Sequence, residues 1–230
     1  MTTLVLAGCG GSEEERAITT TSTGAASAGV TATTGPDRPV ETPRAPDRSY
    51  SAQELERALL TVTDLPTGWS ADPDGKPGHD SPEQFAECPK YAALVRKLNG
   101  MAEGATGFVS PTGSDVSENL RSLSQTGAAA LFAEQTEAIT ACPRLTGTTD
   151  SGLSFTMSLT ALSFPRLGDE TFAFRGATTA YGTTVTADVV TVRRGGVLVG
   201  IAHTAKGPVD TAVTEDLIRR ALDKAAKVLV

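Results

Sequence analysis

The sequence has little of three things that many functional classes depend on: long apolar runs, basic charge and histidine. It contains no run of about 18 apolar residues, so nothing in it predicts a helix that crosses a bilayer. The 20 basic residues are outnumbered by 27 acidic ones, which gives a net charge of −7. This balance argues against a nucleic-acid binder and against electrostatic docking on anionic lipids, because both need a basic face.

Histidine is limited to two residues, His79 and His203. His79 lies in a segment rich in Gly, Pro and Asp, where we expect a solvated side chain. His203 follows the alternation of Val199 and Ile201 near the end of an expected strand, which favours a partly buried structural histidine over a catalytic base. The sequence has no G-x-S-x-G motif and no His, Cys and carboxylate cluster at zinc spacing. We therefore expect no enzyme, no metal and no cofactor.

A loose calcium site is a weaker alternative, because Asp72, Asp74 and Asp80 share one glycine-containing loop. Carboxylates are the ligands that calcium prefers, but their spacing misses the EF-hand pattern and its closing glutamate. A solvated loop is the simpler interpretation.

Cysteine occurs three times, at Cys9, Cys88 and Cys142, and an odd number in an exported protein calls for an explanation. Residues 6–9 read L-A-G-C, which matches the lipobox of bacterial lipoproteins, whose cysteine takes a diacylglycerol. Two or more acyl chains anchor a protein stably, since each buried methylene contributes ~0.8 kcal/mol. Lipidation of Cys9 leaves Cys88 and Cys142 as a single pair.

The segment before Cys9 is too short for a complete signal peptide. Its apolar stretch is limited to residues 4–6 and no basic residue precedes it, whereas a signal peptide has a basic start and about 7–15 apolar residues. We expect residues 1–9 to be a signal-peptide remnant, Cys9 to begin the mature protein, and the true start to lie upstream of Met1. The alternative is a chance L-A-G-C in a cytoplasmic protein.

Residues 10–49 consist mainly of Thr, Gly, Ala, Ser and Pro and contain no aromatic residue. Such a segment cannot bury enough apolar area to offset the entropy of ordering, so we expect a disordered tether. Its proline-rich end, residues 36–46, favours polyproline II. The composition also fits O-glycosylation, which is compatible with a tether. This layout predicts a membrane-anchored protein whose folded domain, residues 50–230, lies on the extracytoplasmic face.

The folded domain is expected to begin with a short helix. Ser51 and Glu54 form an S-x-x-E capping box ahead of apolar residues at helical spacing. The helix must end before Pro66, because the residue before a proline avoids the α region. For Trp69, the only tryptophan, a core position is favoured over a ligand contact.

Two further helices are expected, over 89–98 and 128–142. The apolar face of the second one includes Cys142, so this side chain points toward the core. This favours a buried disulfide with Cys88, worth about 4 kcal/mol in the chain-entropy model. Two free buried thiols are the alternative.

The apolar period changes to two after residue 152, which predicts strands with one apolar and one polar face. The expected strands are 105–110, 116–124, 153–161, one that contains Phe172 and Phe174, 185–192, and one that starts at Val197. Gly195-Gly196 predicts a two-residue hairpin before the last strand, and an amphipathic helix from about Asp210 closes the chain. This order predicts an α+β fold, an antiparallel sheet of about 4–6 strands with helices packed on one face, including the C-terminal helix.

Residues 58–69, ALLTVTDLPTGW, resemble the LL…DLP.GW opening of exported actinobacterial sensor-like domains and lipoproteins. The sequences A-C-P at 141–143 and L-G-D-E-T at 167–171 fit the same group. Residues 50–230 are thus similar to the extracellular sensor domains of mycobacterial membrane-bound serine/threonine kinases of the PknH type. The resemblance implies an antiparallel sheet with helices, stapled by disulfides, and a cleft for an unknown ligand. This chain offers one possible disulfide where the family has two, and no binding residue is carried over.

These observations favour a lipid-anchored extracytoplasmic protein whose domain binds or senses an unidentified envelope ligand. The ligand would be a small molecule, a lipid or a glycan. An adaptor that docks a membrane or envelope protein is the main alternative. A cell-envelope hydrolase that uses His203 with a serine or carboxylate is the third.

Overall fold

The structure is a computed structural model that describes residues 48–75, 82–148, 154–180 and 182–229. Cys9, residues 10–47 of the expected tether, His79 and Asp80 lie outside the described residues, so the predictions made for them remain predictions. No helix in the described part of the chain is both long enough and apolar enough to cross a membrane.

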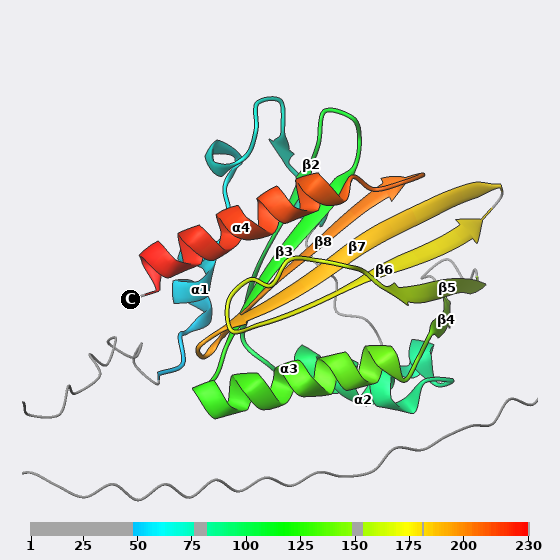
Figure 1. Cartoon of the computed structure of the whole chain (residues 1–230), viewed down its shortest axis with the longest axis horizontal. Helices are drawn as coiled ribbons and strands as arrows, with labels where there is room; N and C mark the ends of the chain where they lie inside the picture. The colour runs from blue at the N-terminus through cyan, green and yellow to red at the C-terminus, as the bar shows by residue number, and fades with distance from the viewer. Residues whose placement is uncertain (1–47, 76–81, 149–153, 181, 230) are drawn as a thin grey trace, which may run out of the picture. The chain divides into compact units, whose positions relative to one another are not determined.

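The described residues form one sheet of eight antiparallel strands (Figure 1). They are β1 (Ser70–Ala71), β2 (Glu103–Val109), β3 (Asp115–Ser122), β4 (Arg144–Thr148), β5 (Ser154–Ala161), β6 (Glu170–Ala180), β7 (Thr183–Arg194) and β8 (Val197–Lys206). The order across the sheet is β1-β2-β3-β8-β7-β6-β5-β4, so all neighbours except β3 and β8 are consecutive in the chain. This order places β8 near the middle of the sheet, between β3 and β7.

The four α-helices of the described residues occupy the predicted places in the chain, and three 3₁₀ turns that were not predicted accompany them. They are α1 (Ala52–Ala58), α2 (Pro89–Asn99), α3 (Gln125–Thr140) and α4 (Thr211–Val228), with η1 (Val62–Asp64), η2 (Pro73–Gly75) and η3 (Pro82–Phe85). The predicted capping box is confirmed: Ser51 Oγ accepts the Glu54 N–H, and Glu54 accepts the Ser51 N–H. Asp210 caps α4 by accepting the Ala212 N–H at 3.0 Å.

The α+β class, the antiparallel sheet and the C-terminal helix are confirmed, but the sheet is larger than predicted. The two strands that the sequence pattern does not reveal are β1 and β4, at the two edges. Strand β1 has only two residues, and Leu145 is the one large apolar residue among the five of β4. Neither strand is long enough or apolar enough to show an alternation.

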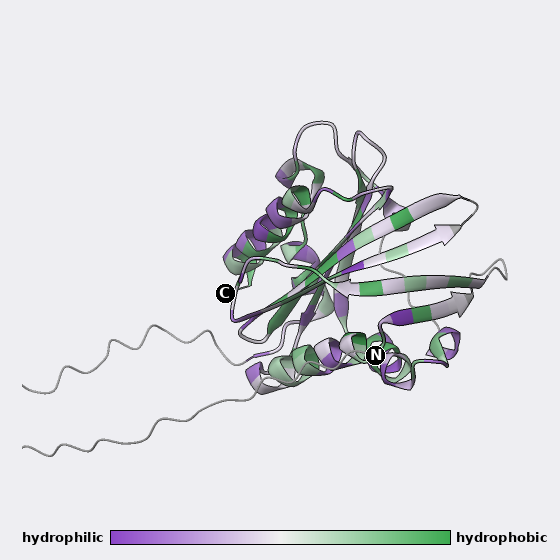
Figure 2. Ribbon diagram, turned by 45° about the vertical axis from the view of Figure 1, so that its right-hand side comes forward, coloured by the Kyte–Doolittle hydropathy of each residue, from purple (hydrophilic) through white to green (hydrophobic). Residues whose placement is uncertain are grey.

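Helices cover both faces of the sheet, which corrects the prediction that they pack on one face (Figure 1). Helices α1 and α4 pack on the face that includes Val199 and Ile201, whereas α3 packs on the face that includes Leu198. Successive residues of a strand point to opposite faces, and Leu198 and Val199 are both buried. Since the centre of the sheet is apolar on both sides, each side needs a cover. Figure 2 shows the hydrophilic residues of α4 gathered on its outer side.

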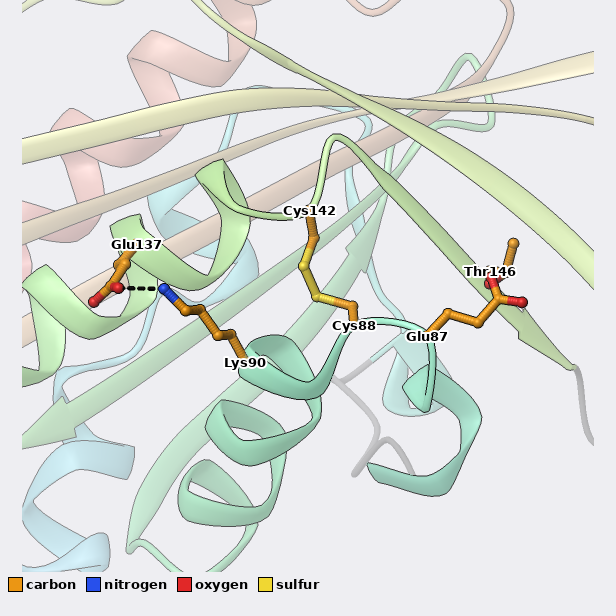
Figure 3. Close-up of a disulfide and its surroundings, with 6 residues drawn as sticks. All are labelled: Glu87, Cys88, Lys90, Glu137, Cys142 and Thr146. Atoms are coloured by element: carbon orange, nitrogen blue, oxygen red, sulfur yellow. Dashed lines mark hydrogen bonds and ion pairs between the residues drawn. A yellow bond between two sulfur atoms is a disulfide. The ribbon is translucent and has the colours of Figure 1, made fainter.

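A disulfide between Cys88 and Cys142 joins the start of α2 to the end of α3 (Figure 3), as the sequence predicts. The two Cα atoms are 6.1 Å apart, and both cysteines lie in an apolar cluster with residues of α2, β4 and β5. An ion pair between Lys90 and Glu137 joins the same two helices nearby. The disulfide therefore ties α2 to α3, and the apolar cluster around it packs this pair of helices against the β4–β5 edge.

Candidate functional site

A cleft of about 1010 Å³ opens at one end of the sheet, where three loops meet. Its lining comes from Pro66 and Trp69, the β2–β3 turn at 110–114, the end of β8 with His203, and residues of the segment 208–216. We call this hollow the Trp69 cleft. Its walls come from segments that are distant in the chain, and the sheet and α4 hold them in place.

Two glycines with positive φ shape the walls of the cleft. Gly113, at φ +78°, closes the β2–β3 turn, in which its N–H donates to the Ser110 carbonyl at 3.0 Å. Gly68, at φ +95°, lies against Pro111, and a Cβ there would meet the Pro111 ring at 2.8 Å. Glycine adopts this region without the steric cost that other residues bear. The loop that carries Trp69 therefore packs directly on the β2–β3 turn.

Trp69 is partly buried, and its ring packs against the main apolar core, as the sequence predicts. The same side chain also lines the cleft. Trp69 can thus both pack against the core and contact a ligand, although the sequence presents these roles as alternatives. A ring held by the core is a rigid apolar surface for a ligand to contact.

His203 is buried, at 3% exposure, on the face of β8 that α4 covers. Its Nδ1 lies 2.9 Å from Thr214 Oγ1 in the first turn of α4. Its Nε2 lies 3.2 Å from Oγ of Ser114, the residue just before β3. His203 lies near the strand end as predicted but is more fully buried than expected, and the structure brings to it a serine that the sequence did not single out. The pairing arises because β3 and β8 are neighbours, with Val116 opposite His203.

A chain of hydroxyls leads from this histidine to the cleft. Ser114 and Ser110 place their Oγ atoms 2.7 Å apart, and Thr112 Oγ1 lies 3.0 Å from Ser110 Oγ. At the other end, the Thr214 hydroxyl donates to the Asp210 carbonyl at 3.4 Å. In the tautomer of His203 with its hydrogen on Nδ1, Thr214 Oγ1 accepts from Nδ1–H and Nε2 accepts from the Ser114 hydroxyl. In the other tautomer both hydrogen bonds run in the opposite direction.

Burial lowers the pKa of His203, while the charges of Asp188 and Asp210 act in the opposite direction. Asp188 is fully buried beside His203, its partner residue on β7. Its carboxylate is held by Arg175, whose Nε and Nη2 donate at 2.6 and 2.8 Å, and by the Thr211 hydroxyl at 2.8 Å. The negative charge of Asp188 is therefore paired, and the neutral form of His203 is favoured near pH 7.

Asp72, which the sequence placed in a possible calcium loop, lines a smaller hollow of about 370 Å³ together with Asp115. Asp80 lies outside the described residues, so the proposed set of three aspartates is not tested. Among the residues that the structure describes, no group of three His, Cys, Asp or Glu side chains is placed to hold a metal ion.

Comparison with known proteins finds a solved structure with a similar fold. No protein-family model and no curated protein matches the chain. Among solved structures, the extracellular domain of PknH from Mycobacterium tuberculosis is similar, with a TM-score of 0.52 and 12% sequence identity. The match covers 80% of this chain and 98% of that domain. The likeness confirms the PknH-like fold that the sequence predicts.

Proposed function

We propose that residues 50–230 form an extracytoplasmic sensing domain that binds a small envelope ligand in the Trp69 cleft. The observation that carries the proposal is the cleft itself, whose volume of about 1010 Å³ is that of a small-molecule site. Its lining combines the Trp69 ring with several polar side chains that can fix the orientation of a ligand. The fold shared with the extracellular domain of PknH supports an extracytoplasmic location.

The lining favours a ligand that has both apolar and hydroxyl surfaces, such as a glycan or the head region of a lipid. Trp69 and Pro66 offer an apolar wall, and Thr112 adds a hydroxyl. Asp210 and Asp216 are exposed carboxylates of the same lining, and the carboxylate oxygens not engaged by the Ala212 N–H and Arg220 can accept hydrogen bonds from ligand hydroxyls.

The proposal is tested by ligand screening with matched variants. Thermal-shift and native mass-spectrometry assays against envelope glycans and lipids should find a ligand whose affinity falls about tenfold or more in Trp69→Ala. Thr112→Val, at an exposed position, should weaken binding without altering the core. Val228→Ala, exposed on α4 outside the cleft, is the control and should bind normally. A ligand that binds Trp69→Ala and Thr112→Val as tightly as the wild type would refute the cleft as its site.

We also propose that the domain is held at the membrane through a lipid on Cys9. The L-A-G-C sequence at 6–9 and the composition of 10–49 support this anchor. Mass spectrometry of the native protein should find a diacylglycerol-modified Cys9 at the N-terminus, and Cys9→Ser should release the protein from membranes. An unmodified Met1 on a soluble product would contradict it.

A second candidate function is an adaptor that docks an envelope or membrane protein. It is favoured by a groove of about 550 Å³ along α3, lined mainly by apolar atoms of residues such as Phe132, Ala133 and Ala141. Crosslinking in intact cells separates the two functions. Recovery of a partner crosslinked through α3 would support docking, and recovery of the monomer alone would count against it.

A further inference from the structure

We propose that Ser114 is a nucleophile, which accepts an acyl group from an activated carboxylic ester bound in the Trp69 cleft. This inference goes beyond reversible ligand binding, because it assigns a covalent step to the cleft. It concerns acylation of the serine and claims no turnover.

The first observation is the distance between nucleophile and base. Ser114 Oγ lies 3.2 Å from His203 Nε2, within the reach that proton transfer from a serine to a histidine requires. Both residues line the cleft. Both side chains are mostly buried but border the cleft, so a substrate bound there would meet the exposed edge of the serine.

The second observation is the orientation of the base. Thr214 Oγ1 lies 2.9 Å from Nδ1, and its own hydroxyl donates to the Asp210 carbonyl. In the tautomer that the proposed step uses, Thr214 accepts from Nδ1–H and the lone pair of Nε2 is directed at Ser114. A histidine that serves a nucleophile needs this tautomer, and a third group normally fixes it. Thr214 takes that place as a positioning residue.

The third observation is the surroundings of the serine oxygen. Ser110 Oγ lies 2.7 Å from Ser114 Oγ, and this contact holds the serine side chain in the orientation that faces His203. The buried Asp188 beside His203 favours the imidazolium that forms when the proton is transferred. Burial lowers the pKa of His203 and favours the neutral histidine before the reaction, while the charge of Asp188 is paired with Arg175.

The step balances with the groups at hand. Ser114 Oγ attacks the carbonyl carbon of the ester, and its proton passes to His203 Nε2. The tetrahedral intermediate then collapses, the bond from the carbonyl carbon to the alcohol oxygen breaks, and the leaving alcohol takes the proton from Nε2. The products are an ester on Ser114 and a free alcohol, with His203 again neutral and no change of oxidation state.

The competing explanation is that these hydrogen bonds only fix α4 on the sheet. That role requires the same distances but gives the serine no unusual reactivity. Covalent labelling therefore separates the two explanations.

The experiment treats the intact chain with a fluorophosphonate probe and, separately, with p-nitrophenyl acetate. We expect one adduct per chain, located at Ser114 by peptide mass spectrometry, and one equivalent of p-nitrophenol. Ser114→Ala should abolish the adduct, and His203→Gln should slow labelling by about 100-fold. Ser117→Ala, on the same strand but the opposite face, is the control and should label like the wild type. Circular dichroism checks that each variant is folded.

Thr214 supplies a readout that a purely structural role would not give. Thr214→Ser keeps the hydroxyl and should label at nearly the wild-type rate, while Thr214→Val should label at least tenfold more slowly with the fold intact. A wild-type chain that acquires no adduct, or that acquires it at another residue, overturns the proposal. Loss of labelling with ligand binding preserved would refute this inference alone, whereas labelling of a chain that binds no ligand would refute only the proposed sensing function.

Discussion

Glu118 of β3 is fully buried among the apolar residues between the sheet, α1 and α4. Its Oε2 accepts the Leu60 N–H at 2.7 Å, while Oε1 has no hydrogen-bond partner among the described residues. Burial raises the pKa of this carboxyl to about 8, against the smaller opposing effects of the Leu60 N–H and the Lys224 charge. The side chain is therefore mostly protonated at pH 7, because a buried carboxylate without a partner cation is costly.

This single residue should make the stability of the domain depend on pH. Between pH 4.5 and about 8 the folded state keeps a proton on Glu118 that the unfolded state has lost, so stability should fall as pH rises through this range. Glu118→Gln removes this loss and should raise the free energy of unfolding at pH 8 by roughly 2–4 kcal/mol. Urea unfolding at pH 5 and pH 8 measures the difference. Glu56→Gln, on the exposed side of α1, should leave the wild-type pH slope unchanged.

Equal pH slopes for the wild type and Glu118→Gln would contradict the buried, protonated state of Glu118.

The elements are joined across the domain by contacts at their ends. The disulfide ties the start of α2 to the end of α3, across 54 residues of sequence. Thr211 and Thr214, in the first turn of α4, bond to Asp188 and His203 on the sheet. Such end contacts fix the angle of a helix on a sheet, which apolar packing alone leaves less well determined.

The disulfide can be tested at the scale of these elements. In a Cys9→Ser background, denatured but unreduced protein should show no free thiol, because Cys88 and Cys142 are paired. Replacing both by serine should lower the free energy of unfolding by about 4 kcal/mol, since the unfolded chain loses a closed loop of this length. Thiol titration and denaturant unfolding measure the two effects. Two titratable thiols per chain would contradict the pairing.

At the scale of the whole molecule, the sequence correctly predicted the features that depend on residues close together in the chain. The capping box at Ser51, the helix start at Asp210 and the turn at Gly195-Gly196 follow from local hydrogen bonds and backbone freedom, and all three are confirmed. Coverage of both faces was not predicted, although apolar residues occur at both odd and even positions of β7, such as Val189 and Val190, which point to opposite faces of the sheet.

The candidate site needed information that the sequence pattern does not contain. Ser114 and His203 are 89 residues apart and meet because β3 pairs with β8, and nothing in the pattern of either strand specifies that neighbour. The one available signal was His203 itself, a polar residue at a core-facing position of an alternating strand. A buried polar group needs partners, so its position predicted hydrogen bonds without showing which residues would form them.

The domain boundary expected near residue 50 can be tested by truncation. All described residues belong to one compact unit, residues 43–230. Tyr50 is largely buried and donates its N–H to Ser122 Oγ at 3.0 Å, and Leu55 of α1 is fully buried.

A chain that begins at residue 48 keeps these contacts and should unfold cooperatively, with a free energy of unfolding within about 0.5 kcal/mol of that of the full chain. A chain that begins at residue 61 loses α1 and uncovers the core, so it should lose cooperative unfolding and become sensitive to proteases. Chemical unfolding followed by limited proteolysis compares the three chains, and a marked loss of stability in the chain from residue 48 would mean that the domain extends further toward the N-terminus.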